Sequence, residues 1–140
     1  MRKARKYALD ILYSAELSGK TIAETIESYA TMSGHLVPDY SKQLAHGVVD
    51  HEYLIDAFLA PSLAQDWTIE RMPAVDRALA RIAVYEMVYA ELAAAIAISE
   101  AVSLAEELST ESSPSFLTGV LGHAARVITR TDEKDESGER

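Results

Sequence analysis

The sequence predicts an all-α protein built as one small helical domain. Apolar residues recur at helical spacing along most of the 140-residue chain, and the alternation typical of strands is nearly absent. A hydrophobic fraction of 49% is enough for one packed core at this length. Turn and stop signals divide the pattern into six or so helices with short connections, as in a helical bundle.

The first part of the chain predicts three helices. The first ends at Gly19, because glycine suits the residue after a helix C-terminus. The second begins at Thr21, and a loop over residues 31–39 follows it. A long third helix is expected over residues 40–60, and Pro61 ends it because proline cannot donate the helical hydrogen bond.

The second part predicts three more helices. A connection over residues 60–72 holds Trp67, which we expect to be buried. Helices follow over residues 73–92, 94–108 and 114–128. The middle one is apolar around most of its circumference, which is typical of a central helix.

We expect residues 1–128 to form one domain and residues 129–140 to be a disordered charged tail, because that end is mostly charged and polar. The connections at 31–39 and 60–72 divide the helices, so two small subdomains, about 1–60 and 61–128, are expected within the domain.

Charge is distributed unevenly along the chain. The net charge is −9, which argues against wholesale nucleic-acid binding. Four of the 13 basic residues, however, lie in the first six positions, and residues 82–125 hold no Lys or Arg. A polyanion bound at the N-terminus and a basic protein bound elsewhere would explain this pattern. Charges that merely solvate helix faces would explain it too.

Several classes of protein are excluded or disfavoured. No run of 18 apolar residues occurs, no apolar segment follows the basic start, and there is no cysteine. We therefore expect no membrane span, no secretory signal and no thiolate metal site. We expect a cytoplasmic protein. His46 and Asp50 are spaced i, i+4 and could share a metal ion on one helix face. Such a pair more often forms a hydrogen bond at the surface. No catalytic motif occurs, so we expect neither an enzyme nor a cofactor.

Three places could bind nucleic acid. The basic N-terminus could contact phosphates, with Tyr13 as a stacking ring, or it could be a solvated arm with Tyr13 half-buried. Ser113 and Pro114 suit a helix start that could hold a phosphate, or simply a capped helix with a core Phe116. Arg77 and Arg81 share a helix face, where structural ion pairs explain them as well as binding does.

Four segments resemble the NusB family of transcription antitermination factors, in the right order and at the right spacing over residues 2–128. ARKYALDILY resembles the family's first helix, and WTIERMPAVDRALARIAVYE resembles its central segment. ISEAVSLA resembles its I-N-E-A-V-x-L-A stretch, and FLTGVL resembles its F-V-N-G-V-L signature.

The resemblance implies a seven-helix fold and a function. Family members bind the boxA element of ribosomal RNA leaders together with ribosomal protein NusE, and the complex helps RNA polymerase pass terminators. Some members form homodimers through the RNA-binding surface. By motif position, the residues expected to contact RNA are Arg2, Lys3, Arg5, Lys6, Tyr13, Asp76, Ser112, Ser115 and Phe116. Those expected to contact the protein partner are Tyr85, Glu86 and Tyr89.

Two alternatives stay open. A protein-only interaction module that has lost RNA binding is favoured by the net charge, and by Glu106 and Ser115 at positions that are basic in other members. The second alternative is an RNA-targeting domain related to the appendage of rRNA methyltransferases, which resembles the same fold. Against it, this chain carries no cofactor-binding domain and so could not transfer a methyl group itself.

Overall fold

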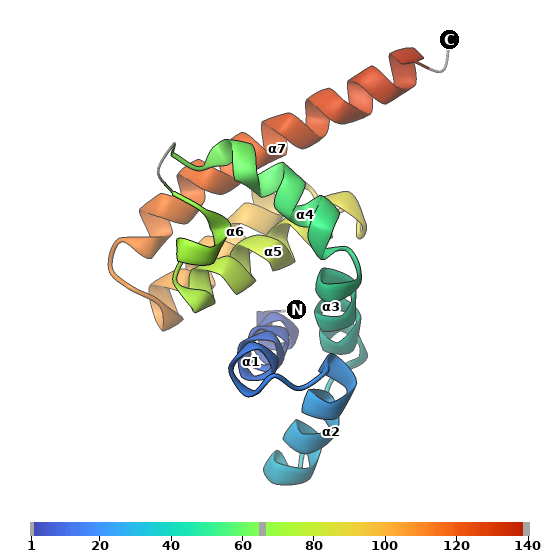
Figure 1. Cartoon of the computed structure of the whole chain (residues 1–140), viewed down its shortest axis with the longest axis vertical. Helices are drawn as coiled ribbons and strands as arrows, with labels where there is room; N and C mark the ends of the chain where they lie inside the picture. The colour runs from blue at the N-terminus through green and yellow to red at the C-terminus, as the bar shows by residue number, and fades with distance from the viewer. Residues whose placement is uncertain (1, 65–66, 139–140) are drawn as a thin grey trace.

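A computed structural model describes residues 2–64 and 67–138, and this part of the chain contains seven α-helices, two short 3₁₀ helices and no strand. Figure 1 shows α1 to α3 on one side of the molecule and α4 to α7 on the other. The elements are α1 (Arg2–Ser18), α2 (Ile22–Ser33), α3 (Asp39–Asp50), α4 (Glu52–Leu59), η1 (Ala60–Ser62), η2 (Ile69–Arg71), α5 (Ala74–Val88), α6 (Ala94–Leu108) and α7 (Ser113–Gly138). The all-α class and the seven-helix fold are confirmed.

Local signals place the first two helices as expected. Gly19 follows α1 with a φ of 71°, a left-handed conformation that glycine adopts without steric cost. Thr21 caps α2: its hydroxyl accepts the backbone N–H of Glu24, whose carboxylate accepts the backbone N–H of Thr21. This reciprocal pair satisfies two free donors at the helix start.

The single helix expected over residues 40–60 is wrong, because the chain forms α3 and α4 with a break at His51. The residue leaves helical geometry with φ −114° and ψ 19°. The break costs little, because the N–H of His51 still bonds the carbonyl of Gly47 and its own carbonyl accepts the N–H of Ile55. Both halves pack on α5, but α3 also lies against α1, whereas α4 also lies against α7.

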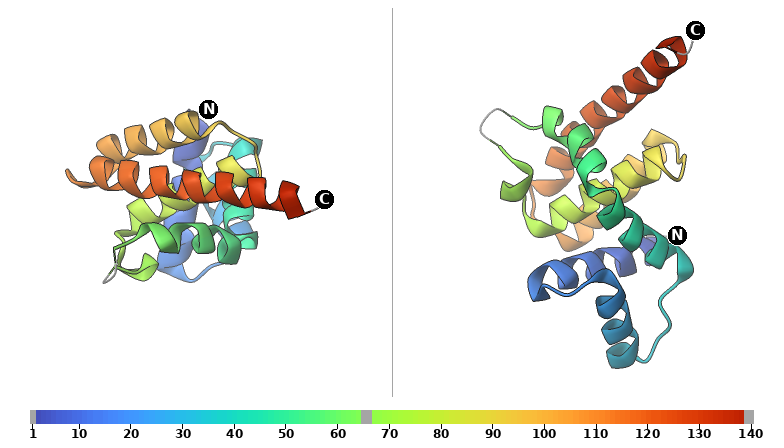
Figure 2. Two further views of the ribbon diagram at one scale, coloured as in Figure 1. Left: turned by 90° about the horizontal axis from the view of Figure 1, so that it is seen from above. Right: turned by 45° about the vertical axis from the view of Figure 1, so that its right-hand side comes forward.

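The C-terminal helix is longer than expected. It continues to Gly138, ten residues beyond Ile128, so the expected disordered tail is wrong for residues 129–138, and residues 139–140 lie outside the described part. Each added residue extends a helix that is already nucleated, which is far easier than starting one. Figure 2 shows this end of α7 projecting from the body.

Helix α5 is the central helix, not α6 as expected. Nine of its residues are buried, and they include polar Asp76 and Glu86. In α6 only Ala97, Ala101, Leu104 and Ala105 are buried, and Ile96 is 50% exposed. The main apolar core draws on α1 and on α3 to α7, and a smaller cluster joins α1, α2 and α3. The division into two subdomains stays a prediction.

A buried polar cluster joins α1 and α3 to the C-terminal end of α5. The guanidinium of Arg5 donates to the carboxylate of Glu86, at 3.0 Å from Nε and 2.8 Å from Nη2. Tyr40 on α3 donates its hydroxyl to the same carboxylate at 2.6 Å. The side chains of Arg5 and Glu86 are 5% and 1% exposed. The cluster therefore sets where α1 lies on α5.

Electrostatics in this cluster follow from its burial. Burial alone would lower the pKa of Arg5, but the hydrogen bond and charge of Glu86 raise it above its ordinary value. Burial and the hydrogen bond to Glu86 raise the pKa of Tyr40 well above its ordinary value. Both groups therefore carry their protons at neutral pH, and Glu86 is matched by two donors.

A glycine on α3 allows Tyr85 of α5 to lie close. A Cβ added at Gly47 would be 2.2 Å from Cε2 of Tyr85, well inside van der Waals contact. The ring of Tyr85 is held by neighbours as well, since it stacks on Tyr89 with centroids 5.4 Å apart. Any side chain at position 47 would have to push this ring aside.

Replacing Glu86 should be costly. Glu86→Ala leaves the buried Arg5 charge with only a contact of 4.0 Å to Glu100, and we expect a loss of about 3–5 kcal/mol in the free energy of unfolding, measured by urea denaturation. The control is Glu107→Ala, which removes an exposed ion pair and should cost no more than about 1 kcal/mol. Equal, small losses from both would show that water reaches Arg5 and compensates its charge.

Replacing Gly47 should also destabilise the fold. Gly47→Ala forces Tyr85 aside, which costs about 1–3 kcal/mol, whereas the gain in helix propensity is roughly 0.5–1 kcal/mol. Thermal unfolding should therefore move to lower temperature. Gly122→Ala on α7 is the control, because its Cβ would meet only Nη1 of Arg126, at 4.0 Å, and it should move unfolding upward. A stabilising Gly47→Ala would contradict the close approach.

Candidate nucleic-acid and partner interface

Basic residues at the start of α1 lie against acidic residues of α6. Nζ of Lys6 is 2.6 Å from a carboxylate oxygen of Glu107, and Nε of Arg2 is 3.9 Å from one of Glu100. The hydrogen bond from Lys6 lowers the pKa of the Glu107 carboxyl. The positive end and the negative stretch of the chain thus partly neutralise each other, an explanation that the charge pattern alone did not suggest.

The four basic residues expected to contact RNA do not share one environment. Lys3 is exposed and forms no ion pair within the part of the chain that the structure describes. Arg2 and Lys6 are partly exposed but paired. Arg5 is buried on Glu86, so its expected phosphate contact is not supported: the guanidinium would have to leave an ion pair that is sealed from water.

The turn between α6 and α7 is fastened to the start of α5 through Asp76. This carboxylate is 2% exposed and accepts hydrogen bonds from the hydroxyls of Ser109 and Ser113, the latter at 2.8 Å. Ser113, expected as the residue before the helix, instead lies in its first turn. Asp76 therefore positions the turn, and its own direct contact with RNA is not supported.

The α6–α7 turn follows the end of α6 that contacts α1. Ser112 and Ser115 are exposed and Phe116 is half-buried. The ion pair of Lys6 ends on Glu107, in the last turn of α6, which joins the two surfaces. Tyr13 is 38% exposed, so it is available as a stacking ring. This ion pair links α1, which carries Lys3 and Tyr13, to the end of α6 that leads into the turn.

The expectation that Trp67 is buried is wrong. The residue is 39% exposed, and its ring lies edge-on to Phe116 with centroids 6.2 Å apart. Its size and apolarity favoured burial. The only signal against burial is its place in an irregular connection, and sequence alone could not show which side of that connection faces solvent.

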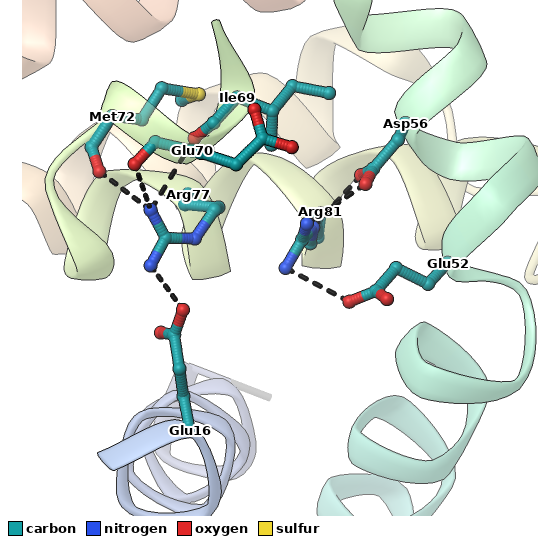
Figure 3. A network of polar contacts seen from close by, with 8 residues as sticks. All are labelled: Glu16, Glu52, Asp56, Ile69, Glu70, Met72, Arg77 and Arg81. Carbon is teal, nitrogen blue, oxygen red and sulfur yellow. Dashed lines mark hydrogen bonds and ion pairs between the residues drawn. The ribbon is translucent and has the colours of Figure 1, made fainter.

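Arg77 is a structural residue. Its guanidinium donates to the backbone carbonyls before α5, at 2.8 Å for Met72, and pairs with Glu16 of α1. Figure 3 shows the side chain between this backbone and α1. The guanidinium thus closes the loop that enters α5 and ties it to α1.

Arg81 is a structural residue too, and it ties α5 to α4. It forms two hydrogen bonds of 2.9 Å to the carboxylate of Asp56 and a further ion pair of 3.1 Å to Glu52 (Figure 3). Burial alone would lower the pKa of Arg81, but Asp56 raises it. Of the two explanations for this arginine pair, the structural one is therefore favoured.

Residues expected at the protein partner differ in accessibility. Tyr85 and Glu86 are 7% and 1% exposed, and Glu86 is already occupied by Arg5 and Tyr40. Tyr89 is half-buried, and its ring stacks on His51 with centroids 4.0 Å apart. Of the three, Tyr89 is the residue that a partner could touch, whereas direct contact with Glu86 is not supported.

The described residues offer neither a metal site nor a membrane span. No group of three or more His, Cys, Asp and Glu side chains that could hold a metal occurs among the side chains described, in residues 2–64 and 67–132. Over the same ranges, no helix combines the length and apolarity needed to cross a membrane.

Comparisons with known proteins agree on one family. The profile of the NusB family matches residues 2–126. A transcription antitermination protein NusB of Salinispora arenicola is 47% identical over 133 residues, which cover 92% of this chain and 97% of the relative. The corresponding protein of Beutenbergia cavernae is 41% identical over 98% of this chain and 97% of its own length.

Solved structures share the fold. NusB of T. maritima superposes with a TM-score of 0.77 at 23% identity, covering 89% of both chains. A chain from a structure described as "Crystal Structure of Antitermination Factors NusB and NusE in complex with dsRNA" gives a TM-score of 0.78 at 24% identity, covering 90% of this chain and 96% of that one.

The family profile spans nearly all of the described chain, and the relatives match over almost their whole length. The chain therefore belongs to the NusB family, whose members are transcription antitermination factors and not enzymes.

Proposed function

We propose that the protein binds the boxA element of ribosomal RNA leaders together with ribosomal protein NusE, as part of an antitermination complex with RNA polymerase in the bacterial cytoplasm. One observation carries this proposal: the ion pair of Lys6 with Glu107 links α1 to the end of α6 that leads into the α6–α7 turn, and accessible residues expected to contact RNA lie on both segments. Family membership supports it, and so does the common fold with a chain solved with NusE and double-stranded RNA.

RNA would bind through a competition between phosphates and acidic side chains. Lys3 can approach a phosphate freely, but Lys6 must leave Glu107 and Arg2 must leave Glu100. These pairs are exposed, so each is worth about 1 kcal/mol or less, and a phosphate can displace the carboxylate. Affinity for RNA alone should therefore be modest, and a basic partner that also neutralises α6 would strengthen it.

Arg5 and Asp76 act as positioning residues in this proposal. Arg5 holds α1 on Glu86, and Asp76 holds Ser113 of the α6–α7 turn. Neither needs to touch RNA for its replacement to weaken RNA binding. Loss of either should displace a whole segment, so reduced binding would accompany reduced stability.

The partner protein would approach near Tyr89 and His51. Their rings stack on each other, and Asp50 and Glu52 flank His51 in the sequence and are exposed. Aromatic faces beside carboxylates suit arginine and lysine side chains, as a basic ribosomal protein would offer. A homodimer through the RNA-binding surface, as in some family members, would compete with RNA for α1.

A protein-only interaction module is the second candidate, and the pairing of α1 with α6 favours it. If Arg2 and Lys6 never leave their carboxylates, the net charge would repel RNA. Fluorescence anisotropy separates the two functions. We expect boxA RNA to bind better than a scrambled RNA, and the preference to sharpen when NusE is added. NusE binding without RNA binding under any condition would establish the second candidate.

Neutralising the acids on α6 should strengthen RNA binding. In Glu107→Gln and Glu100→Gln, Lys6 and Arg2 no longer compete with a carboxylate, and each is expected to tighten boxA binding severalfold at low salt. Glu106→Gln, an exposed acid of α6 without an ion pair to α1 in the described structure, is the matched control. If all three variants tighten binding equally, net charge alone is responsible and the specific pairs play no part.

Charge reversal of Lys3 should weaken RNA binding without affecting stability. Each phosphate of a single-stranded RNA that the protein neutralises adds about 0.7 to the slope of log affinity against log salt, so Lys3→Glu should flatten the slope by that amount. Lys42→Glu on α3 changes net charge equally, outside the proposed surface. An unchanged slope for Lys3→Glu, or the same change for both variants, would remove Lys3 from the interface.

A further inference from the structure

Trp67 is a large aromatic residue that stays partly exposed, as residues that bind a ligand often do. It is the chain's only tryptophan, and 39% of it remains exposed although the core lies nearby. Its ring lies edge-on to Phe116 at 6.2 Å, so one ring supports the other. A partly exposed ring that is supported from one side can serve as a stacking surface, because it loses little freedom when it binds.

Helix α7 leaves its backbone uncovered beside this pair. Gly119 is exposed, one turn after Phe116, and an added Cβ would meet no atom within 4 Å. Its φ is not positive, so the backbone does not require glycine there. Glycine within a helix costs stability relative to alanine. Nothing within the described chain explains this cost, whereas close approach of a ligand would.

The chemistry of the surface favours a nucleobase. Trp67, Phe116 and Gly119 carry no charge. Exposed Ser115 lies on the same side of α7 as Gly119, and exposed Ser112 lies in the turn just before the helix. Phosphate would need a cation, which these five residues do not supply. An unpaired base can stack on an indole whatever its identity, while the serine hydroxyls hydrogen-bond to sugar or base edges.

The surface is also continuous with the proposed RNA interface. Phe116 lies one turn after Ser113, which Asp76 holds at the α6–α7 turn. That turn itself follows the last turn of α6, where Glu107 meets Lys6 of α1. RNA bound along α1 and over the turn would therefore reach Phe116 first and Trp67 next.

We propose that Trp67, Phe116, Ser112, Ser115 and Gly119 form a stacking platform for an unpaired RNA base, with the base on the indole of Trp67 and the sugar-phosphate chain passing close over Gly119. This inference rests on the proposed function and extends it, because it adds Trp67 and Gly119 to Ser112, Ser115 and Phe116, which the family resemblance had indicated as RNA contacts. A peptide side chain on the same platform would be a different result.

The single tryptophan makes the first test direct. Tryptophan fluorescence, excited where tyrosine does not absorb, is titrated with single-stranded boxA RNA, while anisotropy of the labelled RNA reports total binding. We expect quenching that follows the anisotropy curve. Trp67→Leu should weaken binding about tenfold, as expected for one stacked base, and Trp67→Phe should keep most of the affinity. Tyr53→Leu, which removes a 91% exposed ring on α4, is the control.

Gly119→Ala separates binding from folding. Alanine should raise the midpoint of thermal unfolding, because it favours the helix and meets no neighbour. The same variant should weaken RNA binding, because its methyl group holds the RNA chain away. Thr118→Ala is the matched control: it lies next along α7 but toward the other side from Phe116, and should leave RNA affinity unchanged. A structural role cannot produce these opposite directions.

The outcomes distinguish this inference from the function on which it rests. RNA binding without tryptophan quenching, and with full affinity in Trp67→Leu and Gly119→Ala, overturns the platform and leaves the proposed function intact. Absence of RNA binding with and without NusE overturns both. Quenching by NusE but not by RNA would assign the platform to a protein and overturn the inference.

Discussion

The ion pair between Arg5 and Glu86 is the contact on which the rest of the structure depends. It joins the first helix to the central one across 81 residues of sequence, with both side chains almost fully buried. Taking two charges out of water costs about as much as their attraction returns, so such a pair adds little net stability. Its value is geometric, since any other position of α1 would leave a buried charge unmatched. Tyr40 uses the remaining capacity of the carboxylate and brings α3 into the same arrangement.

The position of α1 brings the basic start of the chain against its acidic stretch. Arg2 and Lys6 flank Arg5 along α1 and meet acids of α6. A protein with a net charge of −9 thus keeps these cations on exposed, weak pairs that a phosphate can replace. When a phosphate replaces these carboxylates, the acids of α6 lose their cations, so the interface favours a ligand that arrives with a positively charged partner to neutralise them. This is physically consistent with an adaptor that binds RNA and a basic protein together.

Polar clusters at the two ends of α5 position the segments around it. Asp76 at its start holds the α6–α7 turn, and Glu86 near its end holds α1 and α3. Arg77 and Arg81 between them tie α5 to α1 and α4. A helix that carries four such anchors must lie at the centre, because the anchors draw their partners from several different elements. The surfaces proposed for RNA are thus placed by residues that RNA need not touch.

Sequence by itself determined the fold class, most helix ends and the family. These follow from local physics: apolar spacing, the Thr21–Glu24 cap and Gly19 act within a few residues, and the ordered motifs need no coordinates. Only the tertiary structure decided that Arg5 and Glu86 are buried on each other, that Lys6 meets Glu107, that α3 breaks at His51, and that Trp67 faces solvent. Each of these depends on which distant segment packs alongside, and a pattern along one chain carries no information about the charge or shape that will lie opposite it.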